Sequence, residues 1–221
     1  MSPVSIFSEF QPLEEVLVGQ AHPSTAFDYS QDSELRDGLQ QILQETEEDL
    51  LKLVQIFESM GVTVRRPKSL FTLGEKNGLP QTVDLNLFRF TFPNHPLMPR
   101  DTALIVGNKI IQTYTKSANR YFENWSYYDL FKDYFDRGAH WTSMPPPFLE
   151  KHPPTYDFFE DKKILFHAAN VLKCGRDLFY SHPGVGPWVE KGKGTPSGIE
   201  WLRREIGSDY RIHAAPCAGH L

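Results

Sequence analysis

Cysteine is scarce in this sequence, which has two among 221 residues, Cys174 and Cys217. Two cysteines are too few for a disulfide framework or for a four-cysteine zinc site. Because free thiols suit a reducing compartment, we expect the protein to be cytoplasmic.

Long apolar runs and clusters of basic residues are also missing. No stretch approaches the roughly 20 apolar residues of a membrane span, and residues 1–12 lack the charged start and apolar core of a signal peptide. The net charge of -5 comes from 28 acidic and 23 basic side chains spread through the chain, without a basic run that could follow a phosphate backbone. The sequence therefore argues against nucleic acid and membrane surfaces as partners.

Sequence motifs for metals and phosphates are absent as well. The eight histidines form no His-Glu-x-x-His motif, and Cys217 with His220 supplies at most half of a tetrahedral metal site. The glycine-rich residues 182–198 fail the spacing of a phosphate loop, because Pro187 and Gly194 occupy positions that need glycine and Ser or Thr. We expect no metal and no cofactor, and interpret this stretch as a lid or edge loop.

A packed core has ample material, since 40% of the residues are hydrophobic and 13% are aromatic. Three segments share one order of elements: strand, glycine turn, strand, helix, glycine, strand. Gly107 and Gly175 lie in the predicted hairpin turns of the second and third copies. The interval between them is almost that between Gly138 and Gly207, which are expected to end the helices. This repeat argues for a ring or array of ββαβ modules rather than a doubly wound sheet.

Each repeat contains a predicted helix, over about 33–60, 119–138 and 197–207. Apolar residues at steps of three and four predict one buried face on each of the first two helices. On the first helix they are Leu35, Leu39, Ile42, Leu43, Leu50, Val54 and Phe57. On the second they are Tyr121, Trp125, Tyr128, Phe131 and Phe135. The proline-rich residues 65–80 and 143–157 are predicted to connect the modules as loops over a binding surface.

Polar residues stand at equivalent edges of these modules. Asp101 comes directly before the first strand of the middle repeat, where a carboxylate can project from the sheet edge; a surface ion pair with Arg100 is an equally good interpretation. His167 and Asn170 occupy the corresponding place before the third hairpin, and His220 follows the last strand. We expect these side chains to converge on one shared centre.

Several stretches resemble the N-terminal part of the amidinotransferase family, which includes the glycine and inosamine-phosphate amidinotransferases. The stretches are QPLEEVLVG (11–19), GVTVRRP (61–67), MPRDTALIVGNKII (98–111), RYFE (120–123), FKDYFDRGAHWT (131–142), CGRDLF (174–179) and GIEWLRREIGSDYRIH (198–213). The resemblance implies a pentein-like, pseudo-symmetric α/β propeller around a central pocket. Residues 1–221 would then form a single domain with three of the five blades, incomplete at its C-terminus.

The resemblance also implies a reaction, the transfer of an amidino group from arginine to an amine through a covalent amidino-cysteine. Carboxylates would hold the planar guanidinium by charge-assisted hydrogen bonds, and a histidine would relay protons. Asp101 matches a catalytic and substrate-binding carboxylate, and His220 matches the histidine. His167 would be the further catalytic residue, with Arg120 and Asn170 in substrate binding. The implied partners are a small guanidino substrate and an amine acceptor.

Two departures from the family pattern affect this expectation. The family's Phe-Asp-Ala-Ala-Asp reads Phe-His-Ala-Ala-Asn here, so that His167 and Asn170 replace carboxylates; a lost charge-assisted hydrogen bond costs about 1.5–3 kcal/mol. Neither Cys174 nor Cys217 matches the nucleophile, which is expected beyond Leu221. We therefore expect the chain alone to be inactive.

Two other functions stay open. One is a hydrolase that modifies guanidino compounds with altered substrate choice, and the other is a catalytically silent relative that binds a ligand. A partial ring would expose the apolar flanks of its outer modules, which favours self-association and makes a homo-oligomer possible.

Overall fold

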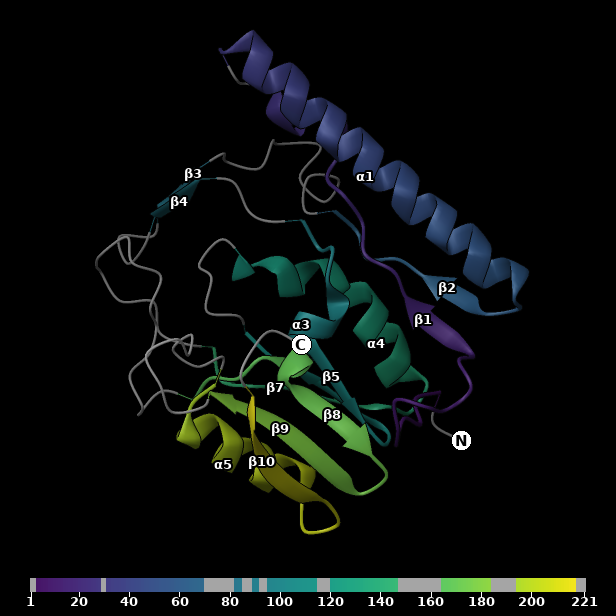
Figure 1. Ribbon diagram of the computed structural model, residues 1–221, viewed down its shortest axis with the longest axis vertical. Coiled ribbons are helices and arrows are strands. Elements are labelled where there is room, and N and C mark those ends of the chain that lie inside the picture. The colour runs from purple at the N-terminus through teal and green to yellow at the C-terminus, as the bar shows by residue number, and fades with distance from the viewer. Residues whose placement is uncertain are drawn as a thin grey trace.

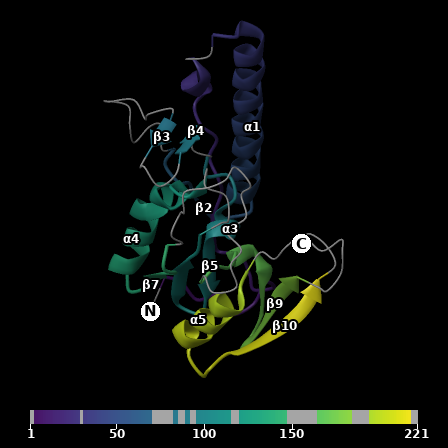
Figure 2. The same cartoon turned by 90° about the vertical axis from the view of Figure 1, so that its left-hand side faces the viewer.

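In the computed structural model the described residues are 3–28, 31–69, 82–84, 89–91, 95–114, 120–146, 164–183 and 194–217. They form a mixed α/β arrangement in which two three-stranded sheets lie next to each other, and the long helix α1 (Ser33–Ser59) lies on the outside (Figure 1). Figure 2 shows that α1 extends well beyond both sheets. None of the helices in the described part of the chain has the length and apolar content to cross a bilayer.

The middle repeat forms one of these sheets, and its predicted hairpin is confirmed. The first two strands are antiparallel, and Gly107 between them has a φ of 57°, a left-handed conformation that favours glycine. The third strand follows a helix and pairs parallel to the second. The elements are β5 (Ala103–Val106), β6 (Lys109–Gln112), the 3₁₀ helix η3 (Glu123–Tyr127), α4 (Tyr128–Asp136) and β7 (His140–Ser143).

The third repeat forms the other sheet with the same order of antiparallel and parallel pairs, which confirms the predicted internal repeat. Its helix begins after Thr195, whose side-chain oxygen accepts a hydrogen bond from the Gly198 amide at 3.0 Å. Gly207, with a φ of 84°, ends that helix as predicted. The elements are the 3₁₀ helix η4 (Ala168–Asn170), β8 (Val171–Cys174), β9 (Asp177–Pro183), α5 (Pro196–Ile206) and β10 (Arg211–Cys217).

The first repeat is reduced to two parallel strands joined by α1, which confirms its predicted helix. The Asp32 carboxylate caps α1 by accepting a hydrogen bond from the Leu35 amide at 3.0 Å. An additional antiparallel pair, β3 with β4, lies where the sequence pattern predicted no strand. These remaining elements are β1 (Glu15–Leu17), the 3₁₀ helix η1 (Ser24–Phe27), β2 (Thr63–Arg65), β3 (Thr82–Asp84) and β4 (Arg89–Thr91).

The buried face predicted for the second helix is wrong in large part. Phe131 is fully buried, but Trp125, Tyr128 and Phe135 are exposed. The reason is that apolar residues follow two neighbouring stripes of this helix with the same spacing, and the stripe that faces the core is displaced by one residue from the predicted one. The residues of η3 and α4 that pack into the core are instead Tyr127, Leu130, Phe131 and Tyr134.

The face predicted for the first helix is only partly buried. Leu43 packs in a small core cluster with Ala21 and Ala26, whereas Leu35 and Ile42 are exposed. Because α1 extends beyond the sheets, much of its length has no sheet to cover an apolar face (Figure 2).

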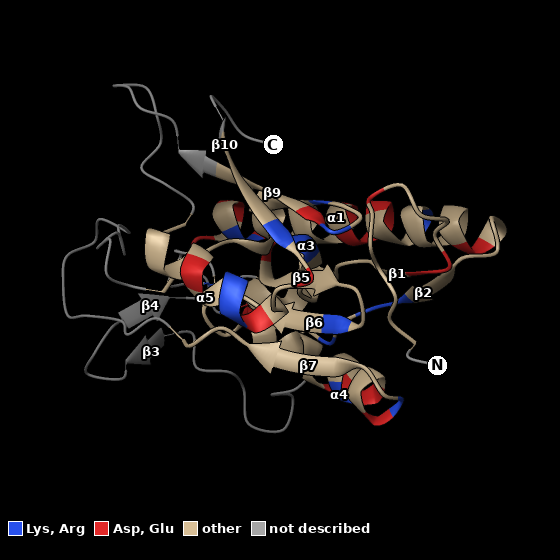
Figure 3. Cartoon of the chain, turned by 90° about the horizontal axis from the view of Figure 1, so that it is seen from below, with Lys and Arg blue, Asp and Glu red and all other residues tan. Residues whose placement is uncertain are grey.

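The two sheets share the main core. Leu104 of β5 and Ile111 of β6 belong to the same cluster of fully or almost fully buried residues as Leu178 of β9 and Leu202 of α5. Acidic and basic residues are mixed along α1, α4 and α5 on the outer surface (Figure 3). The second and third repeats therefore pack as neighbours with a joint apolar interior.

The N-terminal segment crosses the turns of both hairpins. Ile6 and Gly107 exchange backbone hydrogen bonds, and Ser8 forms an antiparallel bridge with Cys174. The Lys173 ammonium lies 2.7 Å from a Glu9 carboxylate oxygen. This segment thus connects the second module to the third.

The predicted loops are only partly covered by the structure. The connectors over residues 65–80 and 143–157 and the glycine-rich residues 182–198 lie mostly outside the described residues. Their interpretation as loops over a binding surface and as a lid stays a prediction.

Candidate functional site

Asp101 lies on the single helical turn α3 (Pro99–Thr102), which leads directly into β5. The proline at its first position suits a helix start, because it needs no backbone N–H there. Thr113, just after β6, fixes this turn: its amide donates to the Thr102 carbonyl at 2.8 Å, and its hydroxyl donates to the Asp101 carbonyl at 3.0 Å. Asp101 therefore stands at a defined place directly before β5.

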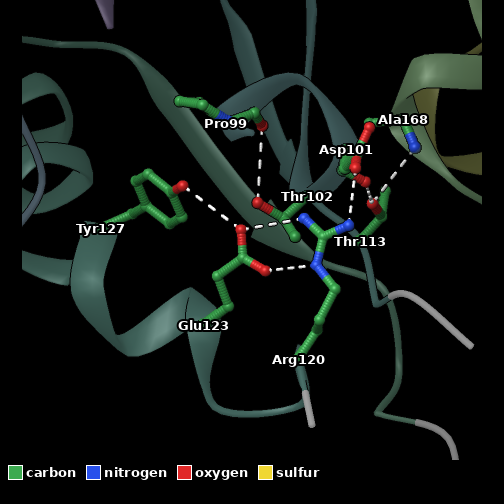
Figure 4. Close-up of polar contacts among 8 residues, drawn as sticks. All are labelled: Pro99, Asp101, Thr102, Thr113, Arg120, Glu123, Tyr127 and Ala168. Carbon is green, nitrogen blue, oxygen red and sulfur yellow. Dashed lines mark hydrogen bonds and ion pairs between the residues drawn. The ribbon is translucent and has the colours of Figure 1, made fainter. Parts of the chain in front are cut away.

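Arg120 links Asp101 to a buried carboxylate, Glu123 (Figure 4). Its Nη1 atom donates to Asp101 Oδ2 at 2.6 Å, while Nε and Nη2 donate to the two Glu123 oxygens at 2.6 and 3.0 Å. The Glu123 side chain is fully buried, and Arg120 is mostly buried. The guanidinium thus forms a bidentate contact with Glu123 on one side and a single hydrogen bond with Asp101 on the other.

The charges of this trio are set by burial and by mutual contact. Burial raises the pKa of Glu123, although Arg120 opposes the shift. Burial also works to lower the pKa of Arg120, but the hydrogen bonds and charges of Glu123 and Asp101 outweigh it and raise this pKa above its ordinary value. The Tyr127 hydroxyl donates to Glu123 Oε1 at 3.5 Å, and burial followed by the Glu123 charge raises the pKa of Tyr127.

The segment of His167 to Asn170 lies beside Asp101. The Ala168 amide donates to the Thr113 hydroxyl at 3.3 Å, and the same hydroxyl donates to Asp101 (Figure 4). Asn170 is buried and His167 is partly exposed. The structure therefore brings together two of the three predicted edges, those of Asp101 and of His167 with Asn170, whereas His220 lies outside the described residues.

The sequence analysis missed several residues of this site. Glu123 stands three positions after Arg120, a spacing that places the two on one helix face and could have predicted their pairing. The ring centroid of His95 lies 5.1 Å from that of His22. Burial lowers the pKa of His95 and the Arg120 charge adds to the effect. A lone histidine in a proline-containing stretch gives no signal of this kind.

Within the described ranges, no three His, Cys, Asp or Glu side chains come together to hold a metal ion. Cys174 is an exposed free thiol. It lies at the end of β8, next to the hairpin turn of the third module.

Comparison with known proteins gives a consistent set of relatives. The chain is 33% identical over 239 residues to inosamine-phosphate amidinotransferase 1 of Streptomyces glaucescens, covering 99% of this chain and 64% of that protein. It is 28% identical over 248 residues to the mitochondrial glycine amidinotransferase of Gallus gallus, covering 96% of this chain and 54% of that protein. The chain is a relative of the amidinotransferases. No protein-family model matches it.

Solved structures extend this relationship to the fold. The saxitoxin-pathway amidinotransferase of Microseira wollei superposes with a TM-score of 0.72 at 29% identity, covering 99% of this chain and 64% of that one. A dimethylarginine dimethylaminohydrolase superposes with a TM-score of 0.53 at 9% identity, over 93% of this chain and 61% of that one, which shows likeness of fold alone. The chain thus spans between half and two thirds of its curated amidinotransferase relatives.

Proposed function

We propose that this protein takes part in amidino-group transfer, from arginine to a small amine acceptor, and that the chain supplies part of the pocket that binds the guanidinium. Similarity to amidinotransferases along nearly the whole chain supports this activity. The repeated strand order of the second and third modules supports three blades of a five-bladed propeller in one domain, residues 1–221.

The observation that carries the proposal is the fixed position of the Asp101 carboxylate. Arg120 occupies its Oδ2 atom and is itself held by the buried Glu123. Because its partner is already ordered, the Asp101 carboxylate loses little conformational freedom when it binds a planar cation. A carboxylate and a guanidinium form short, directional hydrogen bonds with each other. In this role Arg120 positions Asp101. A direct contact between Arg120 and the substrate, which the sequence analysis expected, stays a prediction.

The chemistry around Asp101 would follow from the neighbouring residues. A thiolate, which neither Cys174 nor Cys217 is expected to supply, would attack the guanidinium carbon and form a bond to it, the C–N bond to the ornithine amine would break, and His220 would give a proton to that amine. The acceptor amine would then attack the same carbon, give a proton back to His220 and displace the thiolate. His167 and Asn170, next to Asp101, carry no fixed negative charge, so we expect weaker guanidinium binding than a site with further carboxylates would give.

Binding of L-arginine to the 221-residue chain, measured by isothermal titration calorimetry, tests the proposal. We expect binding that weakens in Asp101→Asn by roughly 10- to 150-fold, the equivalent of about 1.5–3 kcal/mol for one charge-assisted hydrogen bond. Asp209→Asn, the same change at an exposed carboxylate paired with Arg176, should bind as the wild type does. Circular dichroism establishes that both variants fold.

Absence of L-arginine binding in the wild type, or equal binding in Asp101→Asn, would refute the proposal. Mass spectrometry of products separates the remaining functions. We expect the chain alone to form no ornithine from L-arginine and glycine, since Cys174 is at a hairpin end and not in the Asp101 site. Release of citrulline from L-arginine would instead favour the hydrolase.

A further inference from the structure

Helix α1, together with Met60 directly after it, carries a row of exposed apolar side chains along most of its length. The row repeats at alternating steps of four and three residues, and its apolar members are Leu35, Leu39, Ile42, Leu53, Ile56 and Met60. Leu39 is partly exposed, and the other five are 40% to 71% exposed. Single exposed leucines are ordinary on a protein surface, but an aligned row of them indicates an interaction site.

This row is not the side of α1 that packs against its own chain. Leu43 packs with Ala21 and Ala26 in a small core cluster. Glu47, one turn later, accepts hydrogen bonds from two Arg66 nitrogens at 2.6 and 3.0 Å. Leu43 and Glu47 therefore mark the inward side of α1. The exposed row runs along a different stripe of a helix that lies on the outside of the molecule (Figure 1).

The alternation of four and three residues is the seven-residue repeat of a coiled coil, in which two helices pack along a shared apolar seam. The repeat has eight positions between residues 35 and 60, of which six are apolar and two are Thr46 and Asp49. We call these eight positions the α1 seam. At 1.5 Å per residue the seam is roughly 38 Å long. An apolar repeat sustained over about three or more heptads argues for pairing with another helix.

The charges beside the seam indicate which helix that is. Glu45 and Lys52 stand one heptad apart on the same flank, near the middle of the seam. When two copies of α1 pair antiparallel, each Glu45 lies beside the partner's Lys52, and the two-fold axis makes this contact twice. In a single copy the Lys52 ammonium lies 3.0 Å from Asp49, with both side chains more than two-thirds exposed. Such a surface pair is weak, so it leaves Lys52 free to change partner.

A parallel pairing of two copies is disfavoured by the same residues. It would set Asp49 against the partner's Asp49 inside the seam, where like charges repel. It would also leave Glu45 without a basic residue opposite, because the other flank of the seam carries Leu43, Leu50 and Phe57. The antiparallel arrangement instead sets Thr46 against the partner's Asp49. A polar layer of this kind weakens a seam but fixes its register.

We propose that α1 is a self-association surface, on which two copies of this chain pair antiparallel through the α1 seam. The apolar contacts of the pair are Leu35 with the partner's Met60, Leu39 with the partner's Ile56, and Ile42 with the partner's Leu53. The seam lies on the first module, and the Asp101 site lies before the second sheet. The inference therefore does not depend on the proposed amidino transfer.

Sedimentation-velocity ultracentrifugation of the 221-residue chain over a range of concentrations tests the inference. We expect a monomer–dimer equilibrium. Leu53→Glu should raise its dissociation constant by at least about tenfold, because the change places a charge in the seam twice per dimer. The matched control is Leu51→Glu, since Leu51 is 44% exposed on the same helix but lies off the seam. It should dimerise as the wild type does, and circular dichroism establishes that both variants fold.

A charge exchange tests the antiparallel register. Lys52→Glu alone should weaken the dimer by about two- to tenfold at low salt, because two exposed ion pairs become repulsive contacts. Adding Glu45→Lys to the same chain should restore the dimer. This rescue is specific to the antiparallel arrangement, since only there do residues 45 and 52 of the two copies face each other.

Three results would overturn the inference. The first is a wild-type chain that stays monomeric at every concentration. The second is a dimer that Leu53→Glu weakens no more than Leu51→Glu does. If Phe179→Ser dissociated that dimer instead, the contact would lie on β9, where Phe179 is 41% exposed. The third is failure of Glu45→Lys to rescue Lys52→Glu, which would contradict the antiparallel pairing.

Discussion

Glu123 is fully buried, and its carboxylate directs the Arg120 guanidinium toward Asp101. The position of Asp101 before a strand could be predicted, because a local pattern of strand and hairpin turn fixes it. The contacts of Arg120 and Glu123 behind Asp101 were harder to predict, because the burial of Glu123 depends on how η3 packs against the sheet. The position of Asp101 was thus predictable, and the buried support behind it was not.

Replacing the buried carboxylate tests this support. Glu123→Gln leaves the shape but removes the charge that pairs with Arg120, and breaking a buried ion pair on one side typically destabilises by about 3–5 kcal/mol. We expect a loss of about 3 kcal/mol, near the lower limit because glutamine can still accept one hydrogen bond. Urea denaturation measures it.

The matched control is Glu200→Gln, since Glu200 is an exposed partner of Arg203 and Arg204 on α5. Its midpoint of unfolding should equal that of the wild type. If both variants unfold at the same urea concentration, Glu123 does not carry the role assigned to it.

The hairpins of the second and third modules were predictable because their signals are local. Gly107 and Gly175 both adopt positive φ, of 57° and 65°, between short apolar strands, as the turn requires. The face of α4 was not, because two neighbouring stripes of apolar residues follow the same helical spacing and the sequence does not show which of them meets the sheet. The spacing predicts the helix, but packing against the sheet selects its buried face.

Two phenylalanines on α4 provide a direct comparison of the predicted and observed faces. Phe131 is 0% exposed and stacks with Tyr127, whereas Phe135 is 55% exposed. We expect Phe131→Ala to lose about 3–5 kcal/mol of unfolding free energy and Phe135→Ala to change it by less than about 1 kcal/mol. Chemical denaturation of the two variants measures both values. Equal losses would restore the face predicted from the sequence.

Tyr210, in the third module, closely approaches Gly107 in the second. A methyl group added at Gly107 would lie 2.6 Å from the Tyr210 hydroxyl and would also occupy a backbone with a φ of 57°. Neighbouring residues of one sheet were predictable from the repeat, but the packing of one sheet on the other was not, since it depends on side chains far apart in the chain.

Alanine at this glycine tests how closely the modules pack. Gly107→Ala should lower the free energy of unfolding by at least about 1 kcal/mol, because of the left-handed backbone and the crowded hydroxyl. Gly38→Ala, in α1 with nothing within 4 Å of the added carbon, should raise it by up to about 1 kcal/mol. Thermal unfolding distinguishes the two, and a stabilised Gly107→Ala variant would contradict the observed packing.

Residues 3–10 reach across the turns of two hairpins that lie much later in the chain. Their docking closes a long loop, and the entropy of that closure is repaid only when both turns exist. This segment should therefore dock last during refolding and detach first under mild denaturant. A tag fused directly ahead of Ser5 would hinder the docking of this segment on the two turns, whereas a tag attached through a flexible spacer would not.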